Sequence, residues 1–311
     1  MGNDIALPNV RRSLHFRIEN YEGTNFQSLS PKNQDVLVVK RKLQDLGFDP
    51  TELYKDSTHP VNFYERIISE LDRMLTLSKG AAQGIINPYQ VNFIQIQAHG
   101  VMLGQDTLIA VPSSGGGMQY INIQNIAQSF AEVPNSFNIF LIECCRVPLL
   151  HWEQQSLDPS ALPQYPKKMP GVSIIIHGCD AGQPLVEHSN TDGTRAWCVG
   201  TQRFLLRLQE TQGKKQYSWM EFFAGYEPSV LTQISSLPYA KWKRLQIFAP
   251  RQLFEDYQKQ VYRVLSAEPR IVTADPTPQV GGSDMFNIGR IQGGGGAGKA
   301  DLFTHESTDK Q

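Results

Sequence analysis

A histidine and a cysteine in this sequence have the types and the placement that nucleophilic catalysis requires. His99 comes just after the segment 91–97, and Cys145 comes just after the apolar run 137–142. A nucleophilic cysteine needs a base nearby and a thiolate that forms readily, and an imidazole supplies that base. Gly100 leaves its backbone N–H open to a substrate oxygen, and with the N–H of Cys145 it would form an oxyanion hole.

Each of these residues alone has an ordinary structural interpretation. Buried free cysteines are common, and apolar strand ends often carry one. The pair is more informative, because the 46 positions between His99 and Cys145 leave room for a strand and helix crossover. Open parallel sheets place their sites at the carboxyl ends of strands. We therefore expect the two side chains to face each other.

Strand and helix patterns alternate around these residues and indicate an α/β sandwich around a mostly parallel sheet. Gly47 is expected to end the first helix. The predicted strands are 14–18, 52–55, 91–97, 106–111, 137–142 and 172–177. The first predicted helix is capped by Ser30 or Asn33 and runs to about residue 46, and the others span 63–77, 121–131 and about 195–209.

The composition excludes several function classes. With 29 basic and 30 acidic residues the net charge is −1, so no basic excess points to nucleic acid. The four cysteines are too few for a disulfide framework, and no zinc-site spacing occurs, so we expect reduced thiols and neither metal nor cofactor. The N-terminus has no signal-peptide pattern and no membrane-spanning apolar run exists, which predicts a cytoplasmic protein without a membrane partner.

Four segments, in this order, resemble the caspase-like superfamily and within it the paracaspase and metacaspase branch. The resemblance covers roughly residues 13–275 and implies that Cys145 is the nucleophile and His99 its partner. The family's helix that begins near Asn-Asp-Ala is similar to KNQDVLVVKRKLQDLGF, and its His-Gly segment is similar to VNFIQIQAHGVMLGQDTLIAVPSS. The strand before its Asp-Ala-Cys-Arg is similar to FNIFLIECCRV. The start of its small subunit is similar to GVSIIIHGCDAGQPLVEHS, followed by RAWCVGTQRFLLRL.

The sequence departs from the family pattern at several positions. Ala98 replaces the usual Gly, Glu143 replaces the usual Asp, and Cys144 replaces a small residue. The glycine-rich turn after the first strand is missing. We expect Cys144 to point into the core.

The resemblance also implies a caspase-like three-layer sandwich and a division of the chain. Residues 13–280 would form the catalytic domain, between a flexible N-terminus (1–12) and a Gly-rich flexible tail (281–311). The domain would comprise a large-subunit-like part to about residue 150, a linker loop (147–170) and a small-subunit-like part (171–280). Lys167-Lys168 in the loop is either a self-cleavage site or part of a solvated charged loop.

The related proteases have acidic S1 pockets that accept Arg or Lys. Asp35 and Glu143 fall at two of the acidic positions, and Glu187 or Asp180 would supply a third. A guanidinium matches paired carboxylates, although each of these acids also has an ordinary interpretation as a surface charge. The expected function is a cysteine endopeptidase that cleaves protein or peptide substrates after Arg or Lys, with calcium dependence and a homodimer left open.

Two other functions compete with this one. A catalytically weak caspase-like scaffold that acts through protein contacts would tolerate the departures at 98, 143 and 144, but it would not need both Cys145 and His99. A generic α/β hydrolase would need a G-x-S-x-G elbow, which the sequence lacks. The tail segment GGGGAGKA (293–300) nearly matches a phosphate-binding loop, but no strand precedes it and Ala300 replaces the required hydroxyl.

Overall fold

The computed structural model describes residues 9–58, 62–84, 89–113, 117–149, 157–164, 170–212 and 245–248. Several sequence-based predictions fall outside these ranges. They are the expected tail 281–311, the start of the N-terminal segment, the Lys167-Lys168 pair and most of the last part of the proposed small subunit.

A six-stranded sheet with the order β12-β9-β7-β3-β1-β2 forms the centre of the fold. Its first five strands along the chain run parallel, and β12 pairs antiparallel with β9. The predicted α/β architecture with a mostly parallel sheet is therefore confirmed. The strands are β1 (Asn9–Arg17), β2 (Thr51–Lys55), β3 (Tyr89–Gln97), β7 (Ser136–Glu143), β9 (Val172–His177) and β12 (Leu245–Phe248).

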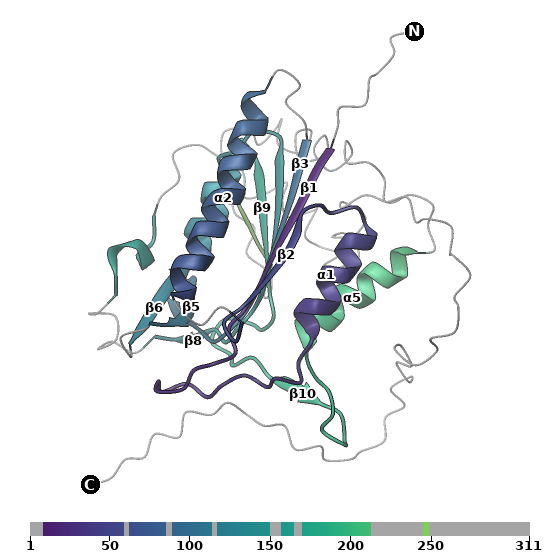
Figure 1. Ribbon diagram of the computed structural model, residues 1–311. Coiled ribbons are helices and arrows are strands. Elements are labelled where there is room, and N and C mark those ends of the chain that lie inside the picture. Colours follow the sequence, from purple (N-terminus) through teal and green to yellow (C-terminus); the bar gives the residue numbers. More distant parts are fainter. Residues whose placement is uncertain are drawn as a thin grey trace.

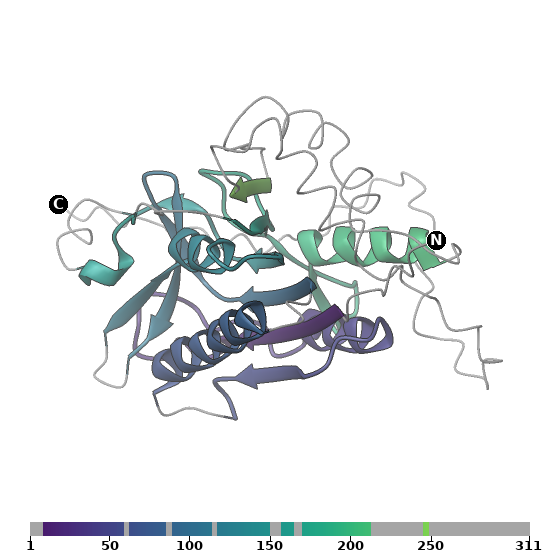
Figure 2. The same ribbon diagram turned by 90° about the horizontal axis from the view of Figure 1, so that it is seen from above.

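Helices lie on both faces of this sheet (Figures 1 and 2). On one face lie α2 (Phe63–Gln83) and α3 (Ile123–Ala131), and on the other lie α1 (Asp35–Asp45) and α5 (Val199–Gln212). The main hydrophobic core lies under α2 and α3. Because side chains alternate along a strand, each strand sends every second residue into that core and the others toward α1 and α5.

Sequence and structure agree on most elements and differ at some of their ends. Gly47 ends α1 as predicted, with a φ of +79° that suits glycine. The N-cap of α1 is Gln34 rather than Ser30 or Asn33. The prediction that the last helix starts at Arg195 is wrong, because residues 196–198 pair as a strand before α5 begins.

A second, four-stranded sheet has the order β6-β5-β4-β8, and a two-stranded sheet joins β10 to β11. Short strands such as β4 and β8 carry too few residues for a clear alternating pattern, which is why the sequence predicted only β5. These strands are β4 (Gly100–Leu103), β5 (Asp106–Pro112), β6 (Met118–Asn122), β8 (Val147–Pro148), β10 (Glu187–Ser189) and β11 (Ala196–Cys198), and a 3-10 helix spans Pro159–Ala161.

None of the helices in the described ranges combines the length and the apolar character needed to cross a membrane.

Candidate active site

The strand register brings His99 and Cys145 to equivalent positions. In the central sheet, β3 and β7 pair as far as Gln97 and Glu143. Pairing resumes in the second sheet, where Val101 of β4 lies opposite Val147 of β8. In both pairs the partners are 46 positions apart in the sequence, as His99 and Cys145 are. These two residues therefore lie opposite each other, at the point where both segments pass from the central sheet to the second sheet. The predicted juxtaposition of the two strand ends is confirmed.

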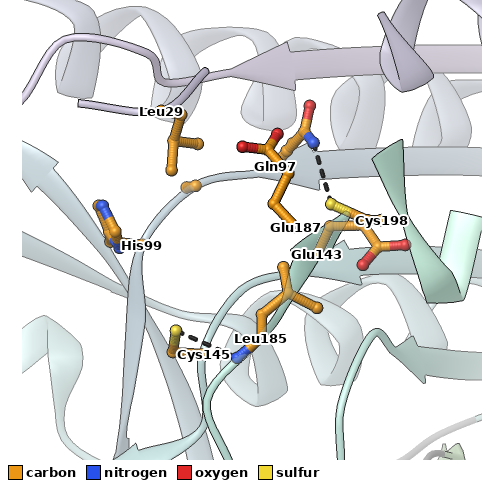
Figure 3. Close-up of a pocket in the computed structure, with 9 residues that line it drawn as sticks. Leu29, Gln97, His99, Glu143, Cys145, Leu185, Glu187 and Cys198 are labelled. Atoms are coloured by element: carbon orange, nitrogen blue, oxygen red, sulfur yellow. Dashed lines mark hydrogen bonds between the residues drawn. The ribbon is translucent and has the colours of Figure 1, made fainter. Parts of the chain in front are cut away.

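A pocket lies over these strand ends (Figure 3). His99 and Cys145 lie on one side of it, and Glu143, Glu187 and Cys198 lie on the other (Figure 3). The pocket thus joins a thiol and an imidazole to an acidic wall. It is lined by Leu29, Gln97, Ala98, His99, Glu143, Cys145, Leu185, Glu187 and Cys198.

Three neighbours fix the imidazole of His99, which is 4% exposed. Its Nε2 lies 2.6 Å from the carbonyl oxygen of Gln27, and because a carbonyl only accepts, Nε2 carries the proton. The ring of Phe26 stacks on it at 4.9 Å, and the ring of Tyr21 meets it edge-on at 4.5 Å. This tautomer leaves Nδ1 as the basic nitrogen, and burial lowers the pKa of His99 below its usual 6.5.

The thiol of Cys145 is partly exposed at the pocket. The backbone N–H of Leu185 donates to its sulfur at 3.2 Å. Burial raises the pKa of the Cys145 thiol, and the hydrogen bond from Leu185 opposes that shift in part. Since burial also lowers the pKa of His99, the resting pair is a neutral thiol and a neutral imidazole.

The neighbouring residues Gly100 and Cys144 are packed tightly together. Cys144 is 1% exposed and belongs to the main core, which confirms the expectation that it points inward. A Cβ atom on Gly100 would lie 2.6 Å from the sulfur of Cys144 and 2.9 Å from the carbonyl oxygen of Cys145. Only glycine fits at this position without a shift of the backbone that carries Cys145.

Glu143 is fully buried on the α1/α5 side of the sheet. The hydroxyl of Thr201 donates to its Oε1 at 2.8 Å. Two glycines make room for the carboxylate, since a Cβ on Gly178 would lie 2.1 Å from Oε2 and one on Gly200 would lie 2.7 Å from Oε1. Sequence reasoning gave neither glycine nor Thr201 a role. The sequence signal that could have indicated this space was a glycine after a predicted strand, Gly178, and a glycine near the start of a helix, Gly200.

The other two acids lie at different depths. Glu187 lines the pocket and accepts a hydrogen bond of 2.6 Å from the side chain of Asn33. Asp35 lies behind the wall, where its carboxylate accepts from the backbone N–H of Cys198 at 2.5 Å and from the Gln202 amide at 3.0 Å. Burial raises the pKa of Asp35 to about 6.

Cys198 is the common neighbour of these acids. Its sulfur accepts hydrogen bonds from the side chains of Gln97 at 3.2 Å and Asn33 at 3.5 Å. Burial raises the pKa of its thiol well above the usual value, and the negative charges of Glu143, Asp35 and Glu187 raise it further. Three carboxylates therefore lie around Cys198, and two of them, Glu143 and Glu187, line the pocket.

One buried arginine lies beneath this acidic wall. Arg17 is fully buried and donates to the carboxylate of Glu19, the side-chain oxygen of Gln97 and the carbonyl oxygen of Ser30. It supports Gln97 from below and does not line the pocket. The lining residues of the pocket include the acids Glu143 and Glu187 and neither a lysine nor an arginine.

Asp180 lies apart from the pocket lining, in the turn after β9. Its charge acts on the guanidinium of Arg146. The structure thus brings His99, Gly100 and Cys145 together with Glu143 and Glu187, places Asp35 one layer behind, and sets Asp180 apart. Sequence reasoning missed seven contacts. Six come from loops or from a short strand, and the seventh is the last residue of β3; they are Tyr21, Phe26, Gln27, Leu29, Leu185, Cys198 and Gln97.

Within the described ranges, no group of three or more His, Cys, Asp or Glu side chains is arranged to hold a metal ion. All four cysteines are free. Compared with models of known protein families and with curated proteins, the sequence gives no match.

Proposed function

We propose that the chain is a caspase-like cysteine endopeptidase that cleaves after Arg or Lys. The single observation that carries the proposal is the position of His99 and Cys145 at register-equivalent strand ends, on a pocket whose opposite wall is acidic. The helices on both faces of the central sheet fit the three-layer sandwich that the resemblance implies. The predicted residues His99 and Cys145 thus line the same pocket as the acids Glu143 and Glu187.

The proposed reaction begins with the neutral pair. The Nδ1 of His99 takes the proton of the Cys145 thiol as the sulfur attacks the scissile carbonyl carbon. The N–H groups of Gly100 and Cys145 stabilise the resulting oxyanion, and the carbonyl of Gln27 stabilises the imidazolium through its hydrogen bond to Nε2. His99 then protonates the leaving amine, which leaves a thioester on Cys145.

Deacylation uses the same groups in reverse. His99 removes a proton from a water molecule, whose oxygen attacks the thioester carbonyl, and it returns a proton to the Cys145 sulfur as the new carboxylic acid leaves. No third acidic residue is needed, because the backbone carbonyl of Gln27 already fixes the ring.

The pocket walls support a preference for a basic P1 residue. Leu29 and Leu185 offer apolar surface to the methylene stem of Arg or Lys. Glu143 and Glu187 offer carboxylates to its charged end, and a guanidinium binds such a pair in a fork.

The decisive experiment is hydrolysis of fluorogenic peptides with Arg, Lys or Asp at P1, with and without calcium. We expect cleavage after Arg or Lys that Cys145→Ala abolishes. Glu143→Gln should lower kcat/KM for the Arg peptide at least about tenfold, the effect of losing a charge-assisted hydrogen bond. Asp180→Asn, which alters an acid away from the pocket, is the matched control and should stay within about twofold of wild type. A preference for Asp at P1 would overturn the proposed pocket.

One observation favours the alternative of a scaffold with weak catalysis. The Cys145 thiol is held neutral by burial, which slows any reaction that starts from a thiolate. Iodoacetamide separates the two functions: an enzyme should alkylate Cys145 faster than Cys144, Cys179 and Cys198, and His99→Ala should remove that advantage.

A further inference from the structure

Tyr21, in the loop after β1, interrupts the hydrogen-bond ladder where β4 begins. Gly100 lies opposite Ile109, so His99 lies opposite Ala110. The N–H of Ala110 donates directly to the His99 carbonyl at 3.0 Å. The N–H of His99 donates instead to the Tyr21 hydroxyl at 2.8 Å, and that hydroxyl donates to the carbonyl of Ala110 at 2.9 Å.

This arrangement differs from an ordinary antiparallel pair. In a hydrogen-bonded pair the two residues exchange both backbone bonds directly. Here one direct bond is kept, and the other is replaced by a bridge through a phenol oxygen. The hydroxyl therefore acts as a wedge that holds the His99 backbone away from β5.

Tyr21 also contacts the side chain of His99. Its ring meets the imidazole edge-on, with 4.5 Å between centroids and an angle of 76° between planes, while Phe26 stacks on the imidazole. Tyr21 is 1% exposed, so it has no freedom to leave this contact without repacking. One residue thus constrains both the backbone and the ring of the proposed base.

We propose that Tyr21 is a positioning residue that holds His99 toward Cys145, an inference that rests on the proposed peptidase function. In the second sheet β4 lies between β5 and β8, and β8 follows Cys145 in the chain. Without the hydroxyl, the N–H of His99 and the carbonyl of Ala110 would bond directly, as in a regular ladder. That closure moves His99 toward β5 and away from Cys145.

The test compares Tyr21→Phe with Tyr54→Phe. Tyr54 is the matched control, because it is also a buried tyrosine whose hydroxyl is hydrogen-bonded, to Glu52 in β2. With an Arg peptide, Tyr21→Phe should lower kcat by roughly 10- to 100-fold, the effect of misplacing a catalytic group, and leave KM within about twofold. Tyr54→Phe should leave both constants within about twofold. An equal loss in both variants, or a rise in KM with kcat unchanged, overturns the proposal.

Alkylation of Cys145 by iodoacetamide provides a readout that does not depend on peptide cleavage. Mass spectrometry resolves Cys145 from the other three cysteines, and His99→Ala gives the rate without the base. We expect Tyr21→Phe to approach that low rate and Tyr54→Phe to keep the wild-type rate. An unchanged rate in Tyr21→Phe overturns the role of Tyr21 even if peptides are cleaved. If Tyr21→Phe slows alkylation of Cys145 and Tyr54→Phe does not, but no peptide is cleaved, the result overturns the proposed peptidase function and supports the positioning role of Tyr21.

A rescue experiment separates positioning from folding. The substitution Tyr21→4-aminophenylalanine retains the ring and puts an amino nitrogen in place of the hydroxyl, where its N–H donates to the Ala110 carbonyl and its lone pair accepts from the His99 N–H. We expect its kcat to be at least about tenfold higher than that of Tyr21→Phe, because misplacement of the base costs a factor of this size. Such a recovery identifies the bridge as the cause of the loss. A variant with native-like thermal unfolding and no recovery overturns the proposal.

Discussion

At the scale of single residues, the protonation of the proposed dyad determines how the site works. His99 and Cys145 are held in their neutral forms by burial, which lowers the pKa of one and raises the pKa of the other. In the proposed reaction, proton transfer between them would therefore accompany the attack on the substrate rather than precede it. The hydrogen bond from Nε2 to Gln27 is in place to receive the charge when it forms.

The dyad predicts the acid limb of the pH profile. Only the neutral imidazole accepts the thiol proton, and burial lowers the pKa of His99. We expect kcat/KM for an Arg peptide to stay near its maximum as the pH falls through 6.5, the ordinary pKa of histidine, and to drop only below it. The measurement is a pH series on wild-type enzyme. A midpoint above 6.5 would show that a resting ion pair, rather than a neutral pair, is the reactive form.

Gly100 gives a second prediction at this scale. Gly100→Ala forces a Cβ against the Cys144 sulfur and the Cys145 carbonyl oxygen, so both stability and activity should fall, with stability lower by about 1–3 kcal/mol. The matched control is Gly80→Ala on the exposed side of α2, where a Cβ meets nothing within 4 Å. That substitution should raise stability by about 0.5–1 kcal/mol. Urea unfolding measures the free energy of unfolding of both variants. Equal changes in the two variants would contradict the tight packing around Gly100.

At the scale of elements, two helices on one face of the sheet support the acidic wall that Glu143 of β7 and Glu187 of β10 form. α1 contributes Asp35 at its first position, and α5 contributes Thr201, which holds Glu143. The bond from the Cys198 N–H to Asp35 ties the start of α5 to the start of α1. The wall therefore depends on how the first residues of α1 and α5 pack together. Glu187 lines the pocket, and Asp35 lies behind the wall at the contact between these two helices.

Asp35 predicts how stability varies with pH. Burial raises its pKa from 3.8 to about 6 in the folded state, so the unfolded chain releases this proton first. Between those two pH values the folded state binds more protons, so the free energy of unfolding contributed by Asp35 falls as the pH rises. The total loss is about 2–3 kcal/mol, and it is complete above pH 6.

The substitution Asp35→Asn should remove this slope. An amide still accepts from the Cys198 N–H and carries no charge to bury, so the variant should be more stable than wild type at pH 7. Urea unfolding of both proteins between pH 4 and 7 measures the difference. If Asp35→Asn were less stable than wild type at pH 7, the ionised carboxylate would be contributing more than its burial costs.

At the scale of the whole molecule, the order of strands places the site on the best-supported part of the fold. β3 and β7 are the two central strands, each paired on both sides. Core side chains cover one face of these strands, and α1 and α5 lie on the other. His99 and Cys145 follow directly from the ends of these strands, so their separation is fixed by a rigid support.

Hydrogen exchange checks this support. Amides of segments 91–97 and 137–143 should exchange slowest, with opening free energies near that of global unfolding, about 5–15 kcal/mol. Segment 51–55 in β2, an edge strand of the described sheet, should exchange faster. Mass spectrometry of peptic peptides resolves the three segments. Equal exchange in β2 and β3 would mean that the site does not rest on the most stable part of the sheet.

The sequence by itself determined most strands of the central sheet and the helices beside them, and it predicted that His99 and Cys145 would lie at neighbouring strand ends. Apolar runs such as 137–142 and 172–177 predict strands because a buried strand needs apolar side chains on both faces. Strand ends in a parallel sheet gather at one edge, which is why His99 and Cys145 were predictable as neighbours. The inward direction of Cys144 was expected because this residue stands where the resembled family has a small side chain, and its side chain is buried.

Only the tertiary structure decided which acids reach the pocket and what holds the base in place. Asp35 and Glu187 are 152 positions apart, and nothing local in the sequence shows that one lies behind the wall and the other lines it. Likewise, the wedge of Tyr21 between His99 and Ala110 joins residues 78 and 89 positions away. Such contacts form when loops and short strands pack together, and local periodicity carries no record of that packing.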